Sequence, residues 1–295
     1  MPPEILLSNV TALAELAATN LVIVAGKGGV GKTTVTAVLA RAAADAGQRV
    51  LVVELDGKPT LDALLPDLEV QHLSAPDLLE EYLFEHGFKR IAKRLVSTGV
   101  IDVVGTAAPG IDDLVVLGKI KQLERSGRWD LVVVDGPAAG HAITFLTAAT
   151  GLLDAARGGP VREQATAVQE LLSDPERCQV VLVTLPETTP VNELIETSYA
   201  IEERVGVRLA PIVVNQVDPT TGLPDPDEVS FGRARAQVDD AIAAAEFRRE
   251  RTAEQRAELD RLTAEVPLRQ VRLAARPTAS LTSHDVAVLA DGLAT

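Results

Sequence analysis

The sequence predicts an α/β fold, a doubly wound and mostly parallel sheet with helices on both faces and helical insertions. Three observations support this prediction: strand-length apolar runs recur, a glycine-rich turn follows the first run, and an alanine-rich stretch follows the turn. The runs are apolar almost without interruption, which is typical of strands buried on both faces of a parallel sheet. They are NLVIVA at 20–25, RVLVVEL at 49–55, DLVVVD at 130–135, QVVLVTL at 179–185 and APIVVN at 210–215.

The first two runs enclose a complete supersecondary unit. Between them lies TTVTAVLARAAADAGQ, whose alanine-rich pattern predicts a helix that ends near Gly47, where a glycine can cap it. Strand, turn, helix and strand together form a βαβ unit of ordinary length. Hydrophobic residues make up 46% of the chain and aromatic residues only 3%, so we expect a core of aliphatic side chains.

Two segments do not follow the alternation of strands and helices, and we interpret both as helical insertions. The first spans about 61–100 and places apolar residues near helical spacing. The second spans about 224–265, is highly charged, and starts in a loop rich in proline and aspartate. These aromatic-bearing insertions either line a groove for a client protein or pack against each other, and the sequence leaves both alternatives open. Their phenylalanines are Phe84, Phe88, Phe231 and Phe247.

Composition excludes several classes of function. The formal net charge is −14, and an acidic surface repels nucleic acid and anionic lipid. No apolar run approaches the roughly 18–20 residues of a membrane-spanning helix, and the N-terminal stretch lacks the basic start of a secretion signal. Cys178 is the only cysteine, which excludes an internal disulfide or a site built from several cysteines. We therefore expect a cytoplasmic protein with no nucleic-acid partner and no direct membrane insertion.

The stretch AGKGGVGKTT at 25–34 has the pattern of a phosphate-binding loop, or P-loop. A strand precedes it and a helix follows, so backbone N–H groups and the helix dipole can hold phosphates. We expect Lys32 to reach the β- and γ-phosphates and Thr34 to contact the α-phosphate. We therefore interpret 1–295 as a single P-loop ATPase domain. The residues expected to bind ATP or ADP here are Gly26, Lys27, Gly28, Gly29, Val30, Gly31, Lys32, Thr33 and Thr34.

A Mg²⁺ site is expected beside the P-loop. The hydroxyl of Thr33 is one candidate ligand, and Asp135, at the end of a predicted strand, occupies the position of a Walker-B carboxylate. Asp56 follows another predicted strand. One of these carboxylates can hold the water shell of the metal while the other orients the attacking water. The alternative for each acid is a structural one, in which it only caps a loop.

With these residues in hand, the sequence resembles the deviant-Walker-A ATPases, P-loop NTPases of the SIMIBI type, for which GKGGVGKTT is the signature loop. Downstream segments are similar to those of the ArsA/Get3 group, the arsenical pump-driving or anion-transporting ATPases, over about residues 18–275. A bacterial branch of this group, without the arsenite and zinc cysteines, is the best match. The similar segments are APGIDDLVVLGKI at 108–120, DGPAAGHAITFL at 135–146, LPETTPVNE at 185–193, VVNQ at 213–216 and VPLRQVRL at 266–273.

The resemblance implies roles for individual residues. Lys27 matches a lysine that crosses a dimer interface to phosphates bound by the partner, where a fixed cation stabilises transition-state charge. The alternative is that Lys27 contacts phosphates of its own subunit, or solvent. Asp56 matches the residue that activates water, which makes Lys27, Lys32 and Asp56 the candidate catalytic residues. Glu187 matches a residue that contacts nucleotide across the dimer, and Asn215 one that reads adenine. Pro267 falls in a segment similar to the C-terminal adenine loop.

The chain departs from the group in three respects. Its segment DGKPTLDA at 56–63 keeps the aspartate of the group's switch I motif, DPAHSLSD, but loses the histidine. With Cys178 as its only cysteine, it lacks the cysteines for arsenite and for a structural zinc. With Met1 as its only methionine, it lacks a methionine-rich client groove.

We expect an ATPase that works as a homodimer, or as a paired heterodimer with a related ATPase subunit. Its ATP-driven cycle of opening and closing would act on an unknown protein partner or client. One alternative is a nucleotide-gated regulatory subunit of a hetero-oligomer with weak hydrolysis. Another is a positioning ATPase of the MinD/ParA type. MinD-like chains end in a basic amphipathic helix, whereas the last 15 residues here, LTSHDVAVLADGLAT, contain no lysine or arginine.

Overall fold

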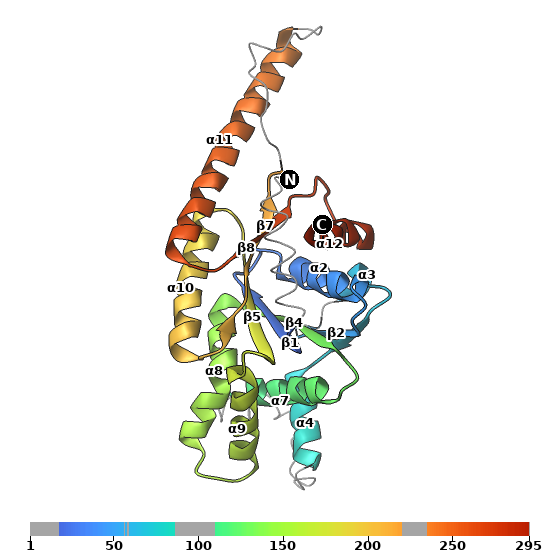
Figure 1. The fold of residues 1–295 in the computed structure, drawn as a ribbon, viewed down its shortest axis with the longest axis vertical. Helices are drawn as coiled ribbons and strands as arrows, with labels where there is room; N and C mark the ends of the chain where they lie inside the picture. Colours follow the sequence, from blue (N-terminus) through green and yellow to red (C-terminus); the bar gives the residue numbers. More distant parts are fainter. Residues whose placement is uncertain (1–17, 56, 58, 86–109, 220–234, 295) are drawn as a thin grey trace.

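The computed structural model describes residues 18–55, 57, 59–85, 110–219 and 235–294. Eight strands form one sheet in the order β3-β2-β4-β1-β5-β7-β8, with β6 paired to β5, and every ladder between described strands is parallel. This confirms the predicted α/β fold (Figure 1). The strands are β1 (Leu21–Gly26), β2 (Val50–Glu54), β3 (Glu69–His72), β4 (Leu131–Ala138), β5 (Cys178–Thr184), β6 (Arg208–Leu209), β7 (Ile212–Val217) and β8 (Gln270–Ala274).

Helices cover both faces of the sheet. One face packs against α2, α3 and α12, and the other against α7, α8, α9, α10 and the C-terminal part of α11 (Figure 1). The helices are α2 (Lys32–Asp45), α3 (Thr60–Leu64), α4 (Ala75–Glu85), α7 (Ile111–Arg125), α8 (Ala139–Ala155), α9 (Pro160–Ser173), α10 (Thr188–Arg204), α11 (Arg235–Glu265) and α12 (Ser283–Ala294).

The strand β1 shows why the apolar runs are continuous. Leu21, Ile23 and Ala25 belong to the core on the α8 and α10 side, whereas Val22 and Val24 belong to the core on the α2 side. Successive side chains of a strand point to opposite faces, so a strand covered twice must be apolar at every position. Complete burial of a Val, Leu or Ile side chain contributes about 1.5–3 kcal/mol, so these two cores hold the layers together.

The five predicted strands and the segment 266–273 correspond to β1, β2, β4, β5, β7 and β8. The strand β3 was not predicted, because its sequence EVQH is polar and its side chains are exposed or half-buried at the edge of the sheet. It lies inside the range 61–100, which the sequence analysis treats as a helical insertion. The described part of that range therefore contains a strand as well as α3 and α4.

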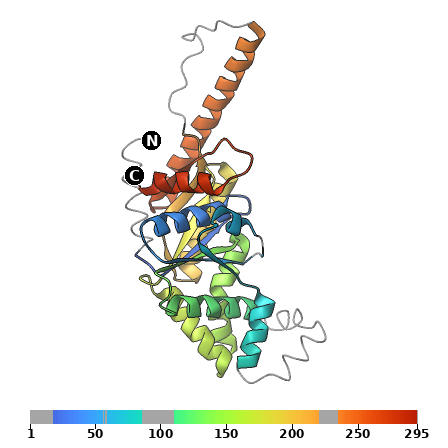
Figure 2. The same cartoon turned by 90° about the vertical axis from the view of Figure 1, so that its right-hand side faces the viewer.

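In the second insertion, α11 extends away from the body of the molecule (Figure 2). The first buried side chain that the structure describes along α11 is Gln255, and the side chains at 239–254 are exposed or half-buried. Phe247 is 65% exposed and Phe84 is half-buried. Phe88 and Phe231 lie outside the described residues, so the client groove stays a prediction.

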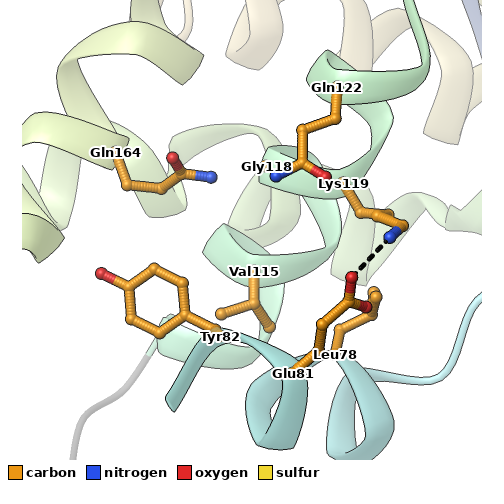
Figure 3. A pocket seen from close by; sticks show the side chains of 8 residues that line it. All are labelled: Leu78, Glu81, Tyr82, Val115, Gly118, Lys119, Gln122 and Gln164. Carbon is orange, nitrogen blue, oxygen red and sulfur yellow. Dashed lines mark hydrogen bonds and ion pairs between the residues drawn. The ribbon is translucent and has the colours of Figure 1, made fainter. Parts of the chain in front are cut away.

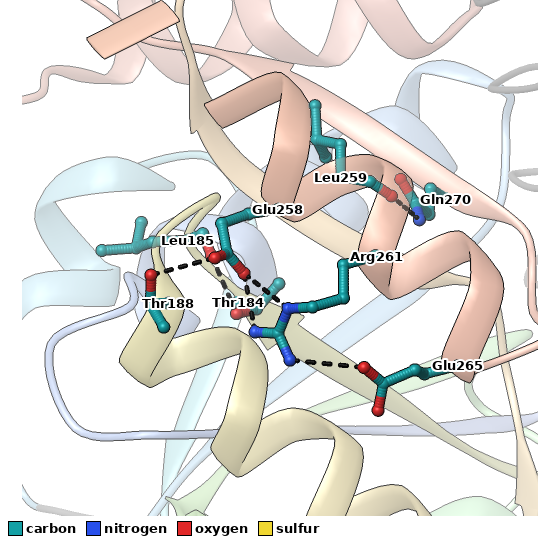
Figure 4. Close-up of polar contacts among 8 residues, drawn as sticks. All are labelled: Thr184, Leu185, Thr188, Glu258, Leu259, Arg261, Glu265 and Gln270. Carbon is teal, nitrogen blue, oxygen red and sulfur yellow. Dashed lines mark hydrogen bonds and ion pairs between the residues drawn. The ribbon is translucent and has the colours of Figure 1, made fainter. Parts of the chain in front are cut away.

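The C-terminal half of α11 is fastened to the sheet and to α10. Leu259 and Leu262 are buried in the core. Glu258 accepts hydrogen bonds from Thr188 of α10 at 2.9 Å and from Arg261 at 2.6 Å (Figure 4). The base of α11 is thus fixed, while its other half is not buried against the sheet.

Within the described residues, no helix combines the length and the apolar character that crossing a membrane requires.

The end of β1 approaches β5 so closely that only glycine fits. A Cβ atom on Gly26 would lie within 3.0 Å of the backbone oxygen of Val183, whereas one on Gly28 would meet no atom within 4 Å. We therefore expect Gly26→Ala to lower the free energy of unfolding by about 1–3 kcal/mol, because the backbone must move. Gly28→Ala is the matched control and should change it by less than about 0.5 kcal/mol. Urea unfolding of the nucleotide-free protein measures both, and equal stability of the two variants would contradict the close approach.

Candidate functional site

The P-loop lies between the end of β1 and the start of α2. Gly31 has a φ of 87° and directly precedes α2, which begins at Lys32. A side chain on Gly31 would also collide with the amide of Asn215. The loop backbone therefore turns into the helix in a conformation that leaves the first N–H groups of α2 available for an anion.

Two hydroxyl groups of α2 point at Asp135, on the neighbouring strand β4. Thr33 Oγ1 donates to Asp135 Oδ2 at 2.7 Å, and Thr36 Oγ1 donates to Asp135 Oδ1 at 3.3 Å. The parallel pairing of β1 and β4 sets Val24 opposite Asp135, which brings this carboxylate beside the P-loop. The structure therefore brings together two residues that are 102 positions apart and that the sequence analysis assigned to one Mg²⁺ site.

Burial raises the pKa of Asp135, and the nearby charge of Glu54 raises it further. The hydroxyls of Thr33 and Thr36 and the charge of Lys32 act in the opposite direction. A desolvated carboxylate of this kind is stabilised by a cation, and hydroxyl and carboxylate oxygens are the hard ligands that Mg²⁺ prefers. The donor set of Thr33 and Asp135 therefore fits Mg²⁺.

Magnesium sites often use only one or two protein ligands together with water and substrate phosphates. That pattern agrees with this chain, because no group of three or more His, Cys, Asp or Glu residues in its described part could hold a metal ion.

The two lysines of the P-loop lie differently. Lys32 Nζ donates to the carbonyl oxygen of Lys27 at 3.4 Å, so its ammonium group stays at the loop. Lys27 Nζ instead forms an ion pair with the carboxylate of Glu193 on α10. The side chains of Lys27 and Glu193 are 33% and 40% exposed. In this structure Lys27 is thus held within its own chain, at a place open to solvent.

Sequence reasoning missed Glu193, although the segment LPETTPVNE ends on it. The residue singled out there, Glu187, directly precedes α10 and lies 3.6 Å from Arg251 of α11. No local pattern links Lys27 to a residue 166 positions away. The second glutamate of the LPETTPVNE segment was the available signal.

Asn215 is buried within β7 and supports the P-loop. Its Nδ2 donates to the carbonyl oxygen of Val30 at 2.9 Å, and its Oδ1 accepts from the N–H of Gln216 at 3.0 Å. The adenine-reading role stays a prediction. Pro267 is exposed in the turn between α11 and β8, and Thr34 is half-buried in the first turn of α2.

Asp56 lies outside the described residues, but the residues around it form a cluster that sequence reasoning missed. Glu54 is buried, with 3% of its side chain exposed, and accepts a hydrogen bond from the N–H of Gly57 at 2.7 Å. His72 Nδ1 lies 2.9 Å from Glu54 Oε2, and His72 Nε2 lies 3.0 Å from Asp62 Oδ2. No sequence pattern linked His72 to this cluster, because its strand was not predicted.

A small cavity of about 20 Å³ lies between α4, α7 and α9, with Tyr82 at its edge (Figure 3). Lys119 of α7 forms an ion pair with Glu81 of α4 at 2.8 Å beside it. The cavity has room for about one water molecule, so it is not a nucleotide or client site.

A larger cavity of about 560 Å³ lies between α11 and the turn that joins β5 to α10. It is lined by Pro186, Glu187, Thr188, Phe247, Glu250, Arg251, Glu254, Gln255, Ala257 and Glu258.

Comparison with known proteins identifies relatives of this chain. A family model described as anion-transporting ATPase matches residues 19–156. The ATPase BagA of Mycobacterium tuberculosis is 34% identical over 232 residues, which cover 69% of this chain and 66% of that protein. An arsenical pump-driving ATPase of Escherichia coli is 32% identical over 202 residues, 66% of this chain and 34% of that protein. The ATPase ASNA1 homolog of Cryptosporidium parvum is 25% identical over 239 residues, 66% of this chain and 64% of that protein. The chain therefore matches only part of the length of each relative.

The contact between Thr33 and Asp135 predicts how Asp135→Asn behaves. The amide keeps the shape of the side chain but removes the negative charge, so we expect the variant to lose the stabilisation that Mg²⁺ and ATP give together. At about one hundred times the dissociation constant this stabilisation is about 2.7 kcal/mol, and thermal unfolding with and without Mg²⁺ measures it. Asp240→Asn, at an exposed position of α11, is the control. An Asp135→Asn variant with an unchanged Mg²⁺ response would remove Asp135 from the metal site.

The same variant has an expected pH dependence without ligand. Because the pKa of Asp135 is raised from 3.8 in the folded state, the stability it contributes is present below that pH and is lost as the pH rises through the raised value. Asparagine does not titrate. The free energy of unfolding of Asp135→Asn relative to wild type should therefore increase as the pH rises from about 4 to about 7. Urea unfolding at the two pH values tests this, and a constant difference would contradict it.

Proposed function

Because this chain belongs to the anion-transporting ATPase family, we propose that it binds ATP at the P-loop and hydrolyses it to ADP and phosphate. The observation that carries the proposal is the hydrogen bond between Thr33 and Asp135. A P-loop hydroxyl and a strand-end carboxylate are the two protein ligands that P-loop NTPases use for Mg²⁺. When bound, Mg²⁺ neutralises charge on the β- and γ-phosphates.

In this mechanism the chain mainly positions the reacting groups and stabilises the charge on the phosphates. The loop N–H groups and Lys32 orient the phosphates of ATP, while Thr33 and Asp135 hold the metal. Asp56 orients and activates a water molecule: its oxygen bonds to the γ-phosphorus as the bond to the bridging oxygen of ADP breaks, and its proton passes to Asp56 and then to solvent. Asn215 donates a hydrogen bond to the carbonyl oxygen of Val30 and so fixes the loop backbone that the phosphates would contact.

Lys27 is proposed to act on ATP bound by a second subunit, either a copy of this chain or a related ATPase. Two observations support the proposal: the side chain of Lys27 is open to solvent, and its partner Glu193 is half-exposed. An ion pair of this exposure stabilises by at most about 1 kcal/mol, so it can exchange for a stronger pair with phosphate. Glu193 would hold Lys27 until the dimer forms.

The proposed client is a protein rather than arsenite. The names of several relatives refer to arsenical pumps, but Cys178 is buried and burial raises the pKa of its thiol to about 12. A thiol of that pKa carries almost no thiolate at neutral pH, and the thiolate is the form that binds metal ions. The exposed part of α11 gives a protein client a large surface instead.

The two lysines give the first kinetic prediction. Lys32→Ala should abolish ATP hydrolysis, and Lys27→Ala should slow it by about 10³-fold or more, as removal of an arginine finger does. Wild-type turnover per subunit should rise with protein concentration, because the site is completed by another subunit. Lys119→Ala, which breaks a distant ion pair with Glu81, is the control. A phosphate-release assay over a range of protein concentrations measures all three.

Full turnover by Lys27→Ala would exclude the trans role. A wild-type chain that hydrolyses no ATP even in a single-turnover assay would favour the regulatory subunit instead.

The contact between Lys27 and Glu193 gives a second kinetic prediction. Glu193→Gln removes the charge that holds Lys27, so dimer formation with ATP should require less protein. The concentration of half-maximal turnover should fall by up to about fivefold, which corresponds to about 1 kcal/mol. Glu196→Gln, an exposed glutamate of the same helix, is the matched control. An unchanged or higher half-maximal concentration for Glu193→Gln would show that the pair does not restrain Lys27.

A further inference from the structure

Glu54 is a buried carboxylate at the end of β2, next to the candidate site. The register of the sheet pairs it with Asp135 of β4 on one side and with His72 of β3 on the other. A buried carboxylate must be satisfied by donors, because removing it from water is costly. Here the N–H of Gly57 and the ring of His72 both lie within 3.0 Å of its Oε2.

His72 bridges two carboxylates with one ring. Its Nδ1 faces Glu54 and its Nε2 faces Asp62, at 2.9 Å and 3.0 Å. Two ionised carboxylates accept from both ring nitrogens only if the imidazole carries two protons. In agreement, the hydrogen bond with Glu54 raises the pKa of His72. When doubly protonated, the imidazole donates to both carboxylates and lies between them.

The bridge joins the two ends of the connection between β2 and α3. Glu54 ends the strand, and Asp62 belongs to α3, which Leu61 and Leu64 anchor in the core. Gly57, within the connection, donates to the same carboxylate that His72 holds. Glu54 Oε2 thus connects this N–H to the ring of His72.

We propose that His72 is a positioning residue for ATP hydrolysis, which acts through Glu54 and Asp62 to fix the end of β2, the N–H of Gly57 and the start of α3. The inference rests on the proposed function, because Gly57 directly follows Asp56, the residue proposed to orient the attacking water. His72 touches neither nucleotide nor metal. It stabilises a geometry in which the turnover step is fast, without adding to the affinity for ATP.

The test compares His72→Ala with His284→Ala, the same change at an exposed histidine of α12. We expect kcat of His72→Ala to fall by about tenfold to a hundredfold, since a displacement of about 1 Å costs that much. KM and the affinity for a non-hydrolysable ATP analogue should stay within about twofold of wild type. The side chain of His72 is 40% exposed, so added imidazole can enter and should restore part of kcat. His72→Gln, which keeps one donor, should lie between wild type and alanine, and it replaces alanine if that variant does not fold.

A second measurement does not depend on activity. Hydrogen exchange of the Gly57 amide should be faster in His72→Ala than in wild type and in His284→Ala, because its acceptor is no longer held. An unchanged kcat, or a loss of ATP affinity in proportion to kcat, would overturn the inference while leaving the proposed function intact. A wild-type chain without turnover would instead remove the proposed function, and the inference with it.

Discussion

The parallel register of β2, β4 and β1 is the constraint on which the site depends. Because these strands run in one direction, their carboxyl ends meet at one edge, and Glu54, Asp135 and the P-loop arrive there together. The strand order also reverses near β1. There the chain connections run from the sheet in opposite directions, and a crevice forms between them, as in other doubly wound sheets. A shift of one residue in this register would exchange inward and outward side chains along whole strands.

The sequence was sufficient for the strands and the loop, and insufficient for the contacts between them. A strand covered on both faces must be apolar throughout, so the central strands could be predicted, whereas the edge strand β3 is covered less and reads EVQH. The P-loop could be predicted because its residues are contiguous. The pairs Lys27 with Glu193 and Glu54 with His72 form across 166 and 18 positions, and no local spacing encodes them. Their assignment needed the register of the folded sheet.

The electrostatics of the site favour a cation. Burial and the charge of Glu54 both make ionised Asp135 unfavourable, and Lys32 offsets only part of that cost. His72 forms a hydrogen bond with Glu54 on the side away from Asp135. The folded protein therefore retains an electrostatic cost at Asp135 that a bound cation would relieve. Binding of a cation there would couple to folding stability through this one carboxylate.

The shape of α11 has a mechanical consequence. Its 31 residues make a helix about 46 Å long, of which roughly half stands clear of the sheet. A tilt of about 10° at the fixed base would therefore move the free end by about 4 Å, so small rotations of the base become larger displacements of the free end. That base contacts the start of α10 through Arg251 and Glu187, and α10 carries the glutamate that holds Lys27. The exposed half of α11 and the P-loop are thus connected through α10, by one ion pair at each contact.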